Sequence, residues 1–303
     1  MRTYDLIIVG AGPAGITASV YAARKRMDFL VITKNIGGQT ALSADIENYT
    51  GYKFITGPEL VEKFKEHMEQ FDVDFRENEP VTLVKKTSDT VKVETDKDKY
   101  QARTVIVASG RIARELGAEG EEKFKHRGVT YCATCDAPLF ADVDVAVVGG
   151  GNSGLDAVLQ AIRIARKVYL IEIGHELRAD PIMVEEAKKS DKLTILTDTR
   201  VEKIHGDAFV EGITVSRAGK KEDLPVRGVF VEIGYDPVSD FLKDVKKNDL
   251  GEIMVNCRCE TNVPGIFAAG DVTDVYGKQI IVACGEGVKA TLAAFDYLNK
   301  LRS

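Results

Sequence analysis

The chain has 303 residues, which is the length of about two average domains. Its 41 basic and 47 acidic residues give a formal net charge of −6 without a long basic block, so no nucleic-acid partner is expected. A hydrophobic content of 44% with 29% charged residues is typical of a globular protein and excludes a disordered or fibrous chain. Five cysteines are too few for a secreted disulfide scaffold, so we expect a cytoplasmic protein.

The first strand–turn–helix unit lies at the N-terminus. An unbroken apolar run at residues 6–9 predicts a buried parallel strand, and a G-x-G-x-x-G turn follows at residues 10–15. A helical pattern extends to about residue 26, and a second apolar run occupies residues 29–32. The uncharged stretch that results could pass for a membrane helix or a signal peptide, but its three glycines and proline argue against both, so no membrane segment is expected.

The same unit recurs 139 residues later. The apolar run at residues 145–148 precedes a second G-x-G-x-x-G turn at residues 149–154, a helical pattern to about residue 165 and a strand at residues 168–171. In such a unit the glycines allow a tight turn and close approach of a pyrophosphate to the helix N-terminus. Two copies therefore predict two dinucleotide sites in one α/β chain.

The residue at the end of the second strand distinguishes the two copies. The second copy has Glu172, whose carboxylate can accept both hydroxyls of an adenosine ribose. The first copy has Thr33 at this position, with no acid beside it. The two sites are therefore expected to hold different dinucleotides.

Further elements are predicted outside the two units. Strands are expected at residues 91–94, 104–108 and 266–269, a solvated amphipathic helix at residues 59–70, and a last helix at residues 285–301. The charged segment at residues 111–126 is a plausible crossing between domains.

A C-x-x-C motif followed by an acid is the sharpest chemical signal. Cys132 and Cys135 have the spacing of a redox pair, and Asp136 follows directly. Half of a zinc site is the competing interpretation, but no second C-x-x-C and no suitably spaced histidine pair is present, so no metal is expected.

The other three cysteines are not expected to take part in redox chemistry. Cys257 and Cys259 are two residues apart on a predicted strand, where both would point to one face. Buried free thiols are favoured over a second redox pair. Cys284 is expected to pack near a cofactor segment.

Two dinucleotide units flanking a C-x-x-C resemble the low-molecular-weight thioredoxin reductases of the pyridine-nucleotide-disulfide oxidoreductase family. The resemblance covers nearly the whole chain, with shared segments at residues 37–39, 47–48, 108–110, 132–136, 264–271 and 278–279. It implies an α/β fold of two Rossmann-like three-layer domains, in which a nicotinamide domain (residues 113–237) is inserted into a FAD domain (residues 1–112 and 238–303). A homodimer is implied as well.

The resemblance also assigns the cofactors to residues. FAD would contact Gly10, Gly12, Pro13, Ala14, Gly15, Thr33, Gly38, Gln39, Asn48, Gly110, Gly270, Asp271, Lys278, Gln279 and Ile280. NADH or NADPH would contact Gly149, Gly151, Asn152, Ser153, Gly154, Glu172 and Arg178.

The implied activity is the reduction of a thioredoxin- or glutaredoxin-like protein. In the family, electrons pass from the nicotinamide through the flavin to a disulfide, here Cys132–Cys135. Cys135 would face the flavin, Cys132 would attack the partner disulfide, and Asp136 would act as general acid/base. A helix cap or turn residue is the alternative interpretation of Asp136.

The sequence departs from the family at the second site. NADPH-using relatives have a His-Arg-Arg run where this chain has Glu172, Ile173 and Gly174, and only Arg178 remains. The acid favours NADH and is similar to the flavoprotein subunits of alkyl hydroperoxide reductases. The sequence has no N-terminal thioredoxin-like domains of the kind found in those proteins, so a separate partner is expected. Ala137-Pro138 also replaces the usual glycine after the acid.

Three rival functions follow from the same motifs. The Cys132–Cys135 pair could work in reverse in a flavin-dependent dithiol oxidase, although the intact second glycine turn argues against it. The missing arginines leave room for a non-nicotinamide donor such as a deazaflavin or a ferredoxin. A redox sensor stabilised by FAD is the non-enzymatic alternative.

Overall fold

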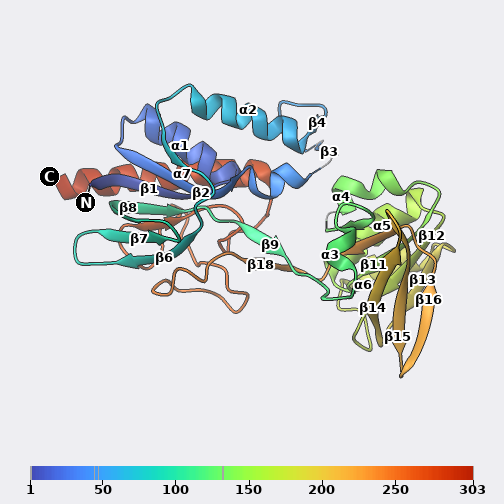
Figure 1. Cartoon of the computed structure of the whole chain (residues 1–303). Helices are drawn as coiled ribbons and strands as arrows, with labels where there is room; N and C mark the ends of the chain where they lie inside the picture. The colour runs from blue at the N-terminus through green and yellow to red at the C-terminus, as the bar shows by residue number, and fades with distance from the viewer. Residues whose placement is uncertain (1, 44, 47, 132, 303) are drawn as a thin grey trace. The chain divides into compact units, whose positions relative to one another are not determined.

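The computed structural model describes residues 2–43, 45–46, 48–131 and 133–302. The chain divides into two compact units: unit 1 comprises residues 1–112 and 236–303, and unit 2 comprises residues 113–235. Unit 2 is thus an insertion in the sequence of unit 1. The chain passes between the units in β9 (Arg111–Ala113) and β18 (Tyr235–Pro237), which pair with each other (Figure 1).

Unit 1 is built on a seven-stranded sheet of order β5-β2-β1-β8-β7-β6, in which β19 also pairs with β8. Its strands are β1 (Thr3–Ala11), β2 (Phe29–Ile36), β5 (Asp74–Arg76), β6 (Val81–Lys86), β7 (Val91–Thr95), β8 (Lys99–Val107) and β19 (Ile266–Ala268). The long strand β8 pairs with β7 through its first half and with β19 through its second half. Strands β5, β2, β1, β8 and β19 are parallel, and β7 and β6 continue the sheet antiparallel.

The helices of unit 1 are α1 (Pro13–Arg24), the 3₁₀ helix η1 (Gly38–Leu42), α2 (Gly57–Glu69) and α7 (Ile280–Arg302), and β3 (Asp45–Ile46) pairs with β4 (Ile55–Thr56). Helices α1 and α7 lie on one face of the sheet (Figure 1). Leu6 and Ile8 of β1 pack against them, whereas Ile7 and Val9 enter a second core on the other face. Because alternate side chains of β1 are buried in two cores, its sequence is apolar without interruption.

Unit 2 has three layers. Its parallel sheet has the order β10-β17-β11-β12-β13, formed by β10 (Val129–Thr130), β11 (Asp144–Val148), β12 (Lys167–Ile171), β13 (Leu193–Leu196) and β17 (Gly228–Val231). One face carries helices, and the other carries the antiparallel sheet of β14 (Thr199–Gly206), β15 (Val210–Arg217) and β16 (Lys220–Leu224). The helices of unit 2 are α3 (Glu121–Phe124), α4 (Ala133–Asp136), the 3₁₀ helix η2 (Ala137–Phe140), α5 (Asn152–Ile164) and α6 (Pro181–Lys188). Two α/β units, each built around a set of parallel strands, confirm the predicted fold class.

The predicted strand through Cys257 and Cys259 is wrong. The N–H of Cys259 donates to the carbonyl of Asn256 at 2.9 Å, which closes a turn, and Cys259 has a φ of +61°. The Asn256 side chain also accepts the N–H groups of Arg258 and Glu260, so it organises the turn. Cys259 is buried, as predicted, but Cys257 is exposed.

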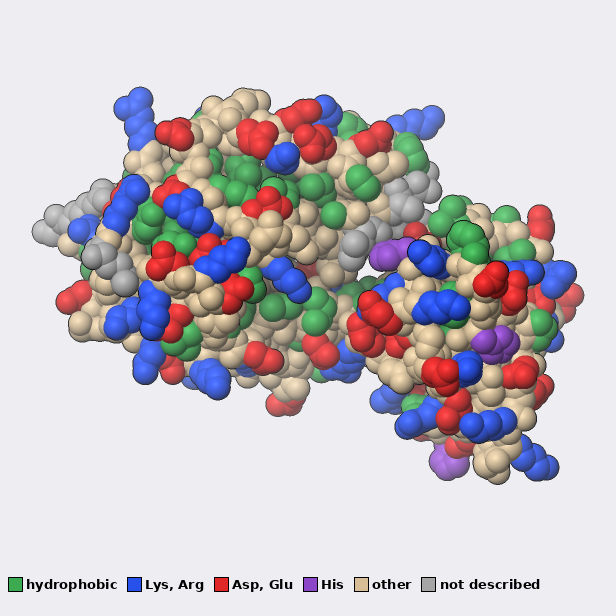
Figure 2. Space-filling model, in the orientation of Figure 1, with side chains coloured by type: hydrophobic (Ala, Val, Ile, Leu, Met, Phe, Trp, Pro, Cys, Tyr) green, Lys and Arg blue, Asp and Glu red, His purple; other side chains and the backbone are tan. Residues whose placement is uncertain are grey.

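The surface agrees with the mixed charge composition. On the face drawn in Figure 2, basic and acidic side chains are interspersed over each unit. In the described part of the chain, the structure has no helix both long and apolar enough to cross a bilayer.

Candidate active site

The first glycine turn joins β1 to α1. Gly10 has a φ of +105°, and a Cβ on Gly15 would lie 1.9 Å from the Gly10 carbonyl oxygen, so this turn requires glycine at both positions. Gly12 is different, because the nearest atom to a Cβ there is the Gly37 oxygen at 4.0 Å. The second glycine of the motif therefore faces open space in front of α1.

The second glycine turn, between β11 and α5, repeats this geometry. Gly149 has a φ of +123°, and a Cβ on Gly154 would lie 1.8 Å from the Gly149 oxygen. A Cβ on Gly151 would meet nothing within 4 Å. In both copies, then, the outer glycines are needed for packing and the middle one leaves space.

Both turns fit a pyrophosphate. Gly12 and Gly151 are the N-cap residues of α1 and α5, and neither helix N-terminus is capped by a side chain. Their first-turn N–H groups are therefore available to an anion, which the helix dipole also favours. Pro13 and Ala14 begin α1, and Asn152 and Ser153 begin α5.

The strand-end residues make equivalent contacts in the two copies. The Thr33 hydroxyl accepts the N–H of Ala11 at 3.2 Å. In the second copy, Oε2 of Glu172 accepts the N–H of Gly150 at 2.6 Å, and its Oε1 accepts the N–H of Gly174 at 2.7 Å. The same backbone position is thus bonded by a neutral hydroxyl in unit 1 and by a buried carboxylate in unit 2.

A cavity of about 460 Å³ lies at the second glycine turn. It is lined by Leu116, Val148, Gly149, Gly150, Gly151, Ser153, Ile171, Glu172, Ile173, Arg178, Thr199, Arg200, Val201, Glu232, Ile233 and Gly234. Gly149, Gly151, Ser153, Glu172 and Arg178 were expected at this site. Arg200 and Glu232 were not predicted at this site. Arg200 lies in β14 and Glu232 follows β17, and neither strand carries a recognisable sequence motif. The side chain of Asn152 instead accepts the N–H of Asp180 at 2.8 Å.

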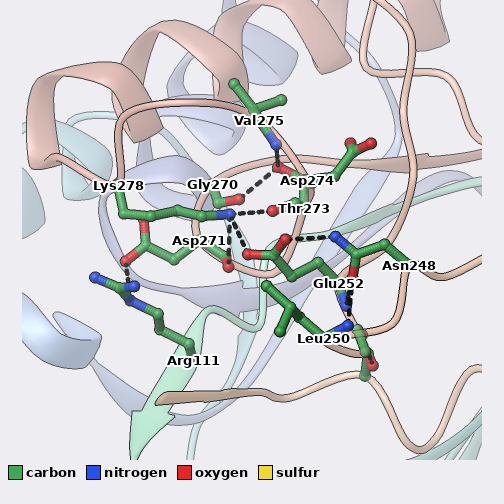
Figure 3. Close-up of polar contacts among 12 residues, drawn as sticks. Arg111, Asn248, Leu250, Glu252, Gly270, Asp271, Thr273, Asp274, Val275 and Lys278 are labelled. Carbon is green, nitrogen blue, oxygen red and sulfur yellow. Dashed lines mark hydrogen bonds and ion pairs between the residues drawn. The ribbon is translucent and has the colours of Figure 1, made fainter. Parts of the chain in front are cut away.

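In unit 1, Gly270 and Asp271 lie in the loop after β19, one residue beyond the end of the strand. Asp271 forms an ion pair with Arg111 at 3.1 Å, and Lys278 pairs with Glu252 at 2.9 Å. Figure 3 shows these side chains gathered around the loop that leads to α7. Burial acts to raise the pKa of Glu252, but hydrogen bonds from Lys278 and Asn248 hold this pKa below its ordinary value. Arg111 and Glu252 were not predicted from the sequence.

The other residues predicted to contact FAD lie near the first glycine turn or near the start of α7. A Cβ on Gly38 would be 3.5 Å from Cα of Gly12, so η1 runs beside the first glycine turn, and Gln39 follows in η1. The Asn48 amide donates to Oε1 of Gln279 at 3.2 Å. Ile280, the next residue, begins α7, and Gly110 follows the end of β8 with a φ of +69°.

The redox motif begins just after β10. Cys132 and the side chain of Cys135 lie outside what the structure describes, but the backbone of Cys135 belongs to α4. Oδ2 of Asp136 accepts a hydrogen bond from the hydroxyl of Thr130, a buried residue. Asp136 precedes η2 but makes no side-chain cap to it, so the alternative interpretation as a helix cap is not supported.

The three other cysteines are free. Burial raises the pKa of Cys259 to about 11, and it also raises the pKa of Cys284, which lies 3.9 Å from the Tyr49 hydroxyl. Among the described residues, no cluster of three or more His, Cys, Asp or Glu side chains is arranged to hold a metal ion.

Known proteins resemble the chain over nearly its whole length. An alkyl hydroperoxide reductase subunit of Staphylococcus epidermidis is 40% identical over 299 residues, which are 97% of this chain and 59% of that protein. The chain thus spans less than two thirds of this relative. Thioredoxin reductase from Streptococcus pyogenes is 37% identical with a TM-score of 0.84, covering 98% of this chain and 99% of the other. The thioredoxin reductase of T. acidophilum is 36% identical with a TM-score of 0.74, covering 99% and 100%.

A family model gives the same result. The model of the pyridine nucleotide-disulphide oxidoreductases matches residues 4–287, a range that includes both glycine turns and the C-x-x-C motif. Together with the match to thioredoxin reductase structures, this range accounts for both units of the fold. The chain therefore belongs to the pyridine nucleotide-disulphide oxidoreductase family.

Proposed function

We propose that the chain is a flavin-dependent disulfide reductase that passes electrons from NADH through FAD and the Cys132–Cys135 pair to a thioredoxin-like protein. One observation carries this proposal. In unit 2, the second glycine turn follows β11 and the C-x-x-C motif follows β10, at the carboxyl ends of strands in the same parallel sheet. In the proposed enzyme, a dinucleotide and a dithiol would therefore be presented at the same edge of one sheet.

The family implies a flavin and a nicotinamide cofactor. We assign FAD to the first glycine turn and to the loop around Asp271 and Lys278, because that turn has the neutral Thr33 where the second has a carboxylate. When bound, the flavin supplies two-electron transfer between the nicotinamide and a disulfide. The chain's own contribution is to bind the dinucleotides and to transfer protons to and from the thiols.

Proton transfer is assigned to Asp136. It follows Cys135 directly, and its carboxylate is held by the Thr130 hydroxyl rather than by a helix end. A carboxyl group fixed beside a dithiol can protonate the thiolate that leaves when a mixed disulfide is resolved. Cys132 would attack the partner disulfide, and Cys135 would be the thiol that faces the flavin when FAD is bound.

NADH is the proposed donor because of Glu172. Its carboxylate lines the cavity and is held by two backbone N–H groups, so it cannot turn away from a 2′-phosphate without losing both bonds. A phosphate beside it would be repelled, whereas ribose hydroxyls can donate to its remaining lone pairs. Arg178 and Arg200 at the same cavity can compensate part of this repulsion.

The proposed partner is a separate thioredoxin- or glutaredoxin-like protein. The two solved structures described above are thioredoxin reductases, and the sparse cysteines suit a reducing cytoplasm. A homodimer in the cytoplasm is part of the same proposal.

The test is anaerobic. The flavin-loaded protein is mixed with NADH or NADPH while the flavin absorbance is followed, and a thioredoxin disulfide is then added. Rapid bleaching by NADH and reoxidation by the disulfide support the proposal, and Cys135→Ser is expected to block only the reoxidation. Absence of bleaching by both nucleotides would refute the nicotinamide donor and leave a deazaflavin or ferredoxin as electron source. Rapid oxygen uptake with a dithiol substrate would instead identify an oxidase.

A further inference from the structure

Three neighbouring strands of unit 2 end at the same edge of the sheet. β10, β17 and β11 are adjacent and parallel, with Thr130 paired to Phe230 and Val148 paired to Val231. β10 leads into the C-x-x-C motif, and β11 leads into the second glycine turn. The residue that follows β17 therefore lies between the two functional elements, and that residue is Glu232.

The contacts of Glu232 reach both elements. Its backbone N–H donates to the carbonyl of Val148 at 2.8 Å, and its own carbonyl accepts the hydroxyl of Ser153 at 3.5 Å. Its carbonyl oxygen would be 2.3 Å from a Cβ on Gly149, so it packs directly on the glycine turn. On the other side, Oε1 accepts the N–H of Ala133, the first residue of α4, at 3.3 Å. Glu232 also lines the 460 Å³ cavity.

The position of Glu232 in the cavity indicates which half of a dinucleotide it meets. Glu172 lies at the end of β12, on one side of the glycine turn, where an adenosine ribose is bound in such folds. β17 lies on the opposite side of β11. A dinucleotide whose pyrophosphate sits at the turn must extend its other half, which carries the nicotinamide, toward the end of β17.

We propose that Glu232 is a positioning residue that couples the nicotinamide site to the dithiol, because its carboxylate holds the start of α4 and the same residue lines the nicotinamide half of the cavity. This inference rests on the proposed function. The oxidised nicotinamide ring carries a positive charge that the reduced ring lacks. The carboxylate therefore favours the oxidised dinucleotide, and the bound cation in turn offsets the negative charge beside the C-x-x-C motif.

Thiol reactivity supplies the first test. The flavin-loaded protein is reduced with dithiothreitol, desalted anaerobically and alkylated with iodoacetamide at fixed pH. Trypsin then yields the peptide 128–163, which contains Cys132 and Cys135 and no other cysteine. Because a thiolate is the reacting species, Glu232→Gln is expected to raise the alkylation rate of this peptide about threefold to tenfold.

Nucleotide affinity supplies the second test, measured by anaerobic calorimetry with NAD⁺ on the oxidised enzyme and NADH on the fully reduced enzyme, so that no electrons are transferred. Glu232→Gln keeps an oxygen that can accept the Ala133 N–H but removes the charge. It is expected to weaken NAD⁺ binding several-fold and to leave NADH binding nearly unchanged, because only the oxidised ring is charged. A merely structural role would change both affinities together. Glu211→Gln, which removes an exposed carboxylate paired with Arg227 in the same unit, is the matched control and is expected to behave as wild type.

The outcomes distinguish a failure of the proposed function from a failure of the role assigned to Glu232. If wild type shows no NADH-driven reduction of thioredoxin, the proposed function fails and this inference fails with it. If wild type turns over but Glu232→Gln alkylates and binds NAD⁺ as wild type does, only the role of Glu232 is refuted.

Discussion

The hydroxyl of Thr130 donates a hydrogen bond to Oδ2 of Asp136. The two residues belong to different elements, because Thr130 ends β10 and Asp136 ends α4. Thr130 is 6% exposed, so water competes little for this bond. The contact fixes the orientation of the proposed general acid/base relative to the sheet that carries the second glycine turn.

Replacement of Thr130 by Val should therefore slow the disulfide half of the reaction. A hydrogen bond to a charged group contributes roughly 1.5–3 kcal/mol, so reoxidation of the reduced enzyme by thioredoxin should fall at least about tenfold. Flavin bleaching by NADH should be unchanged, because it does not use Asp136. Stopped-flow measurement of the two half-reactions separates them. Thr130→Ser retains the hydroxyl and should react as wild type, and equal loss in both half-reactions would contradict this role.

Substitution of the middle glycine of the second turn should impair nucleotide binding, whereas substitution of the last glycine should impair folding. Gly151→Ala adds a methyl group to open space, so folding should be preserved while the affinity for NADH falls at least about tenfold. Gly154→Ala forces a Cβ against the Gly149 oxygen and should lower the free energy of unfolding by about 1–3 kcal/mol or more. Calorimetric binding and urea denaturation of both variants check this.

The equivalent pair in unit 1 is the control. Gly12→Ala should reduce the flavin content of the purified protein, and Gly15→Ala should destabilise the fold, because the first turn has the same geometry. The prediction would be wrong if Gly151→Ala bound NADH with unchanged affinity, since the open space would then not belong to the dinucleotide.

Local pattern made both glycine units predictable. In each, an apolar strand, a turn that only glycine can form and a helix follow one another within 30 residues or so of chain, so sequence neighbours determine the geometry. The structure confirms β1, α1 and β2 in the first copy and β11, α5 and β12 in the second. The strand-end contacts of Thr33 and Glu172 follow from the same repeat.

Features that depend on distant contacts were missed. α7 begins at Ile280, five residues before the predicted start, although Gly285 and Gly287 are poor helix formers. A Cβ on Gly287 would lie 2.2 Å from the carbonyl oxygen of Ala14, so glycine there serves the close packing of α7 on α1. Glu232 gains its position from the strand order β10-β17-β11, which no local motif encodes.

The nucleotide preference should depend on the charge of Glu172 and not on its backbone contact. Glu172→Thr copies the first unit, where the Thr33 hydroxyl accepts the corresponding N–H, so the glycine turn should keep its conformation. Removal of the carboxylate should lower the ratio of kcat/KM for NADH to that for NADPH about tenfold or more. Glu176→Gln, an exposed acid in the same loop, is the control. An unchanged ratio in Glu172→Thr would assign the preference to other residues.

Alkaline pH should lower the stability of the fold through the buried thiol of Cys259. Its side chain is fully buried, and burial, with Glu286 nearby, raises its pKa from 9.0 to about 11. Below about pH 9 the thiol is protonated in both the folded and the unfolded chain, so its stabilising contribution is complete. Between about pH 9 and pH 11 the unfolded chain loses this proton while the folded chain keeps it, and the free energy of unfolding should fall by about 1.4 kcal/mol per pH unit from this group alone.

Cys259→Ala removes this thiol and should flatten the pH dependence. Its free energy of unfolding at pH 7 should be lower than that of wild type, because a buried sulfur is lost, but the difference should shrink as the pH rises toward about 11. Urea denaturation of both proteins across this pH range measures the difference between their free energies of unfolding. The other ionising groups are present in both proteins, so their contributions cancel in this difference. Cys257→Ala changes an exposed thiol two residues away and should keep the wild-type slope. Parallel curves for wild type and Cys259→Ala would show that the buried thiol does not carry the alkaline sensitivity.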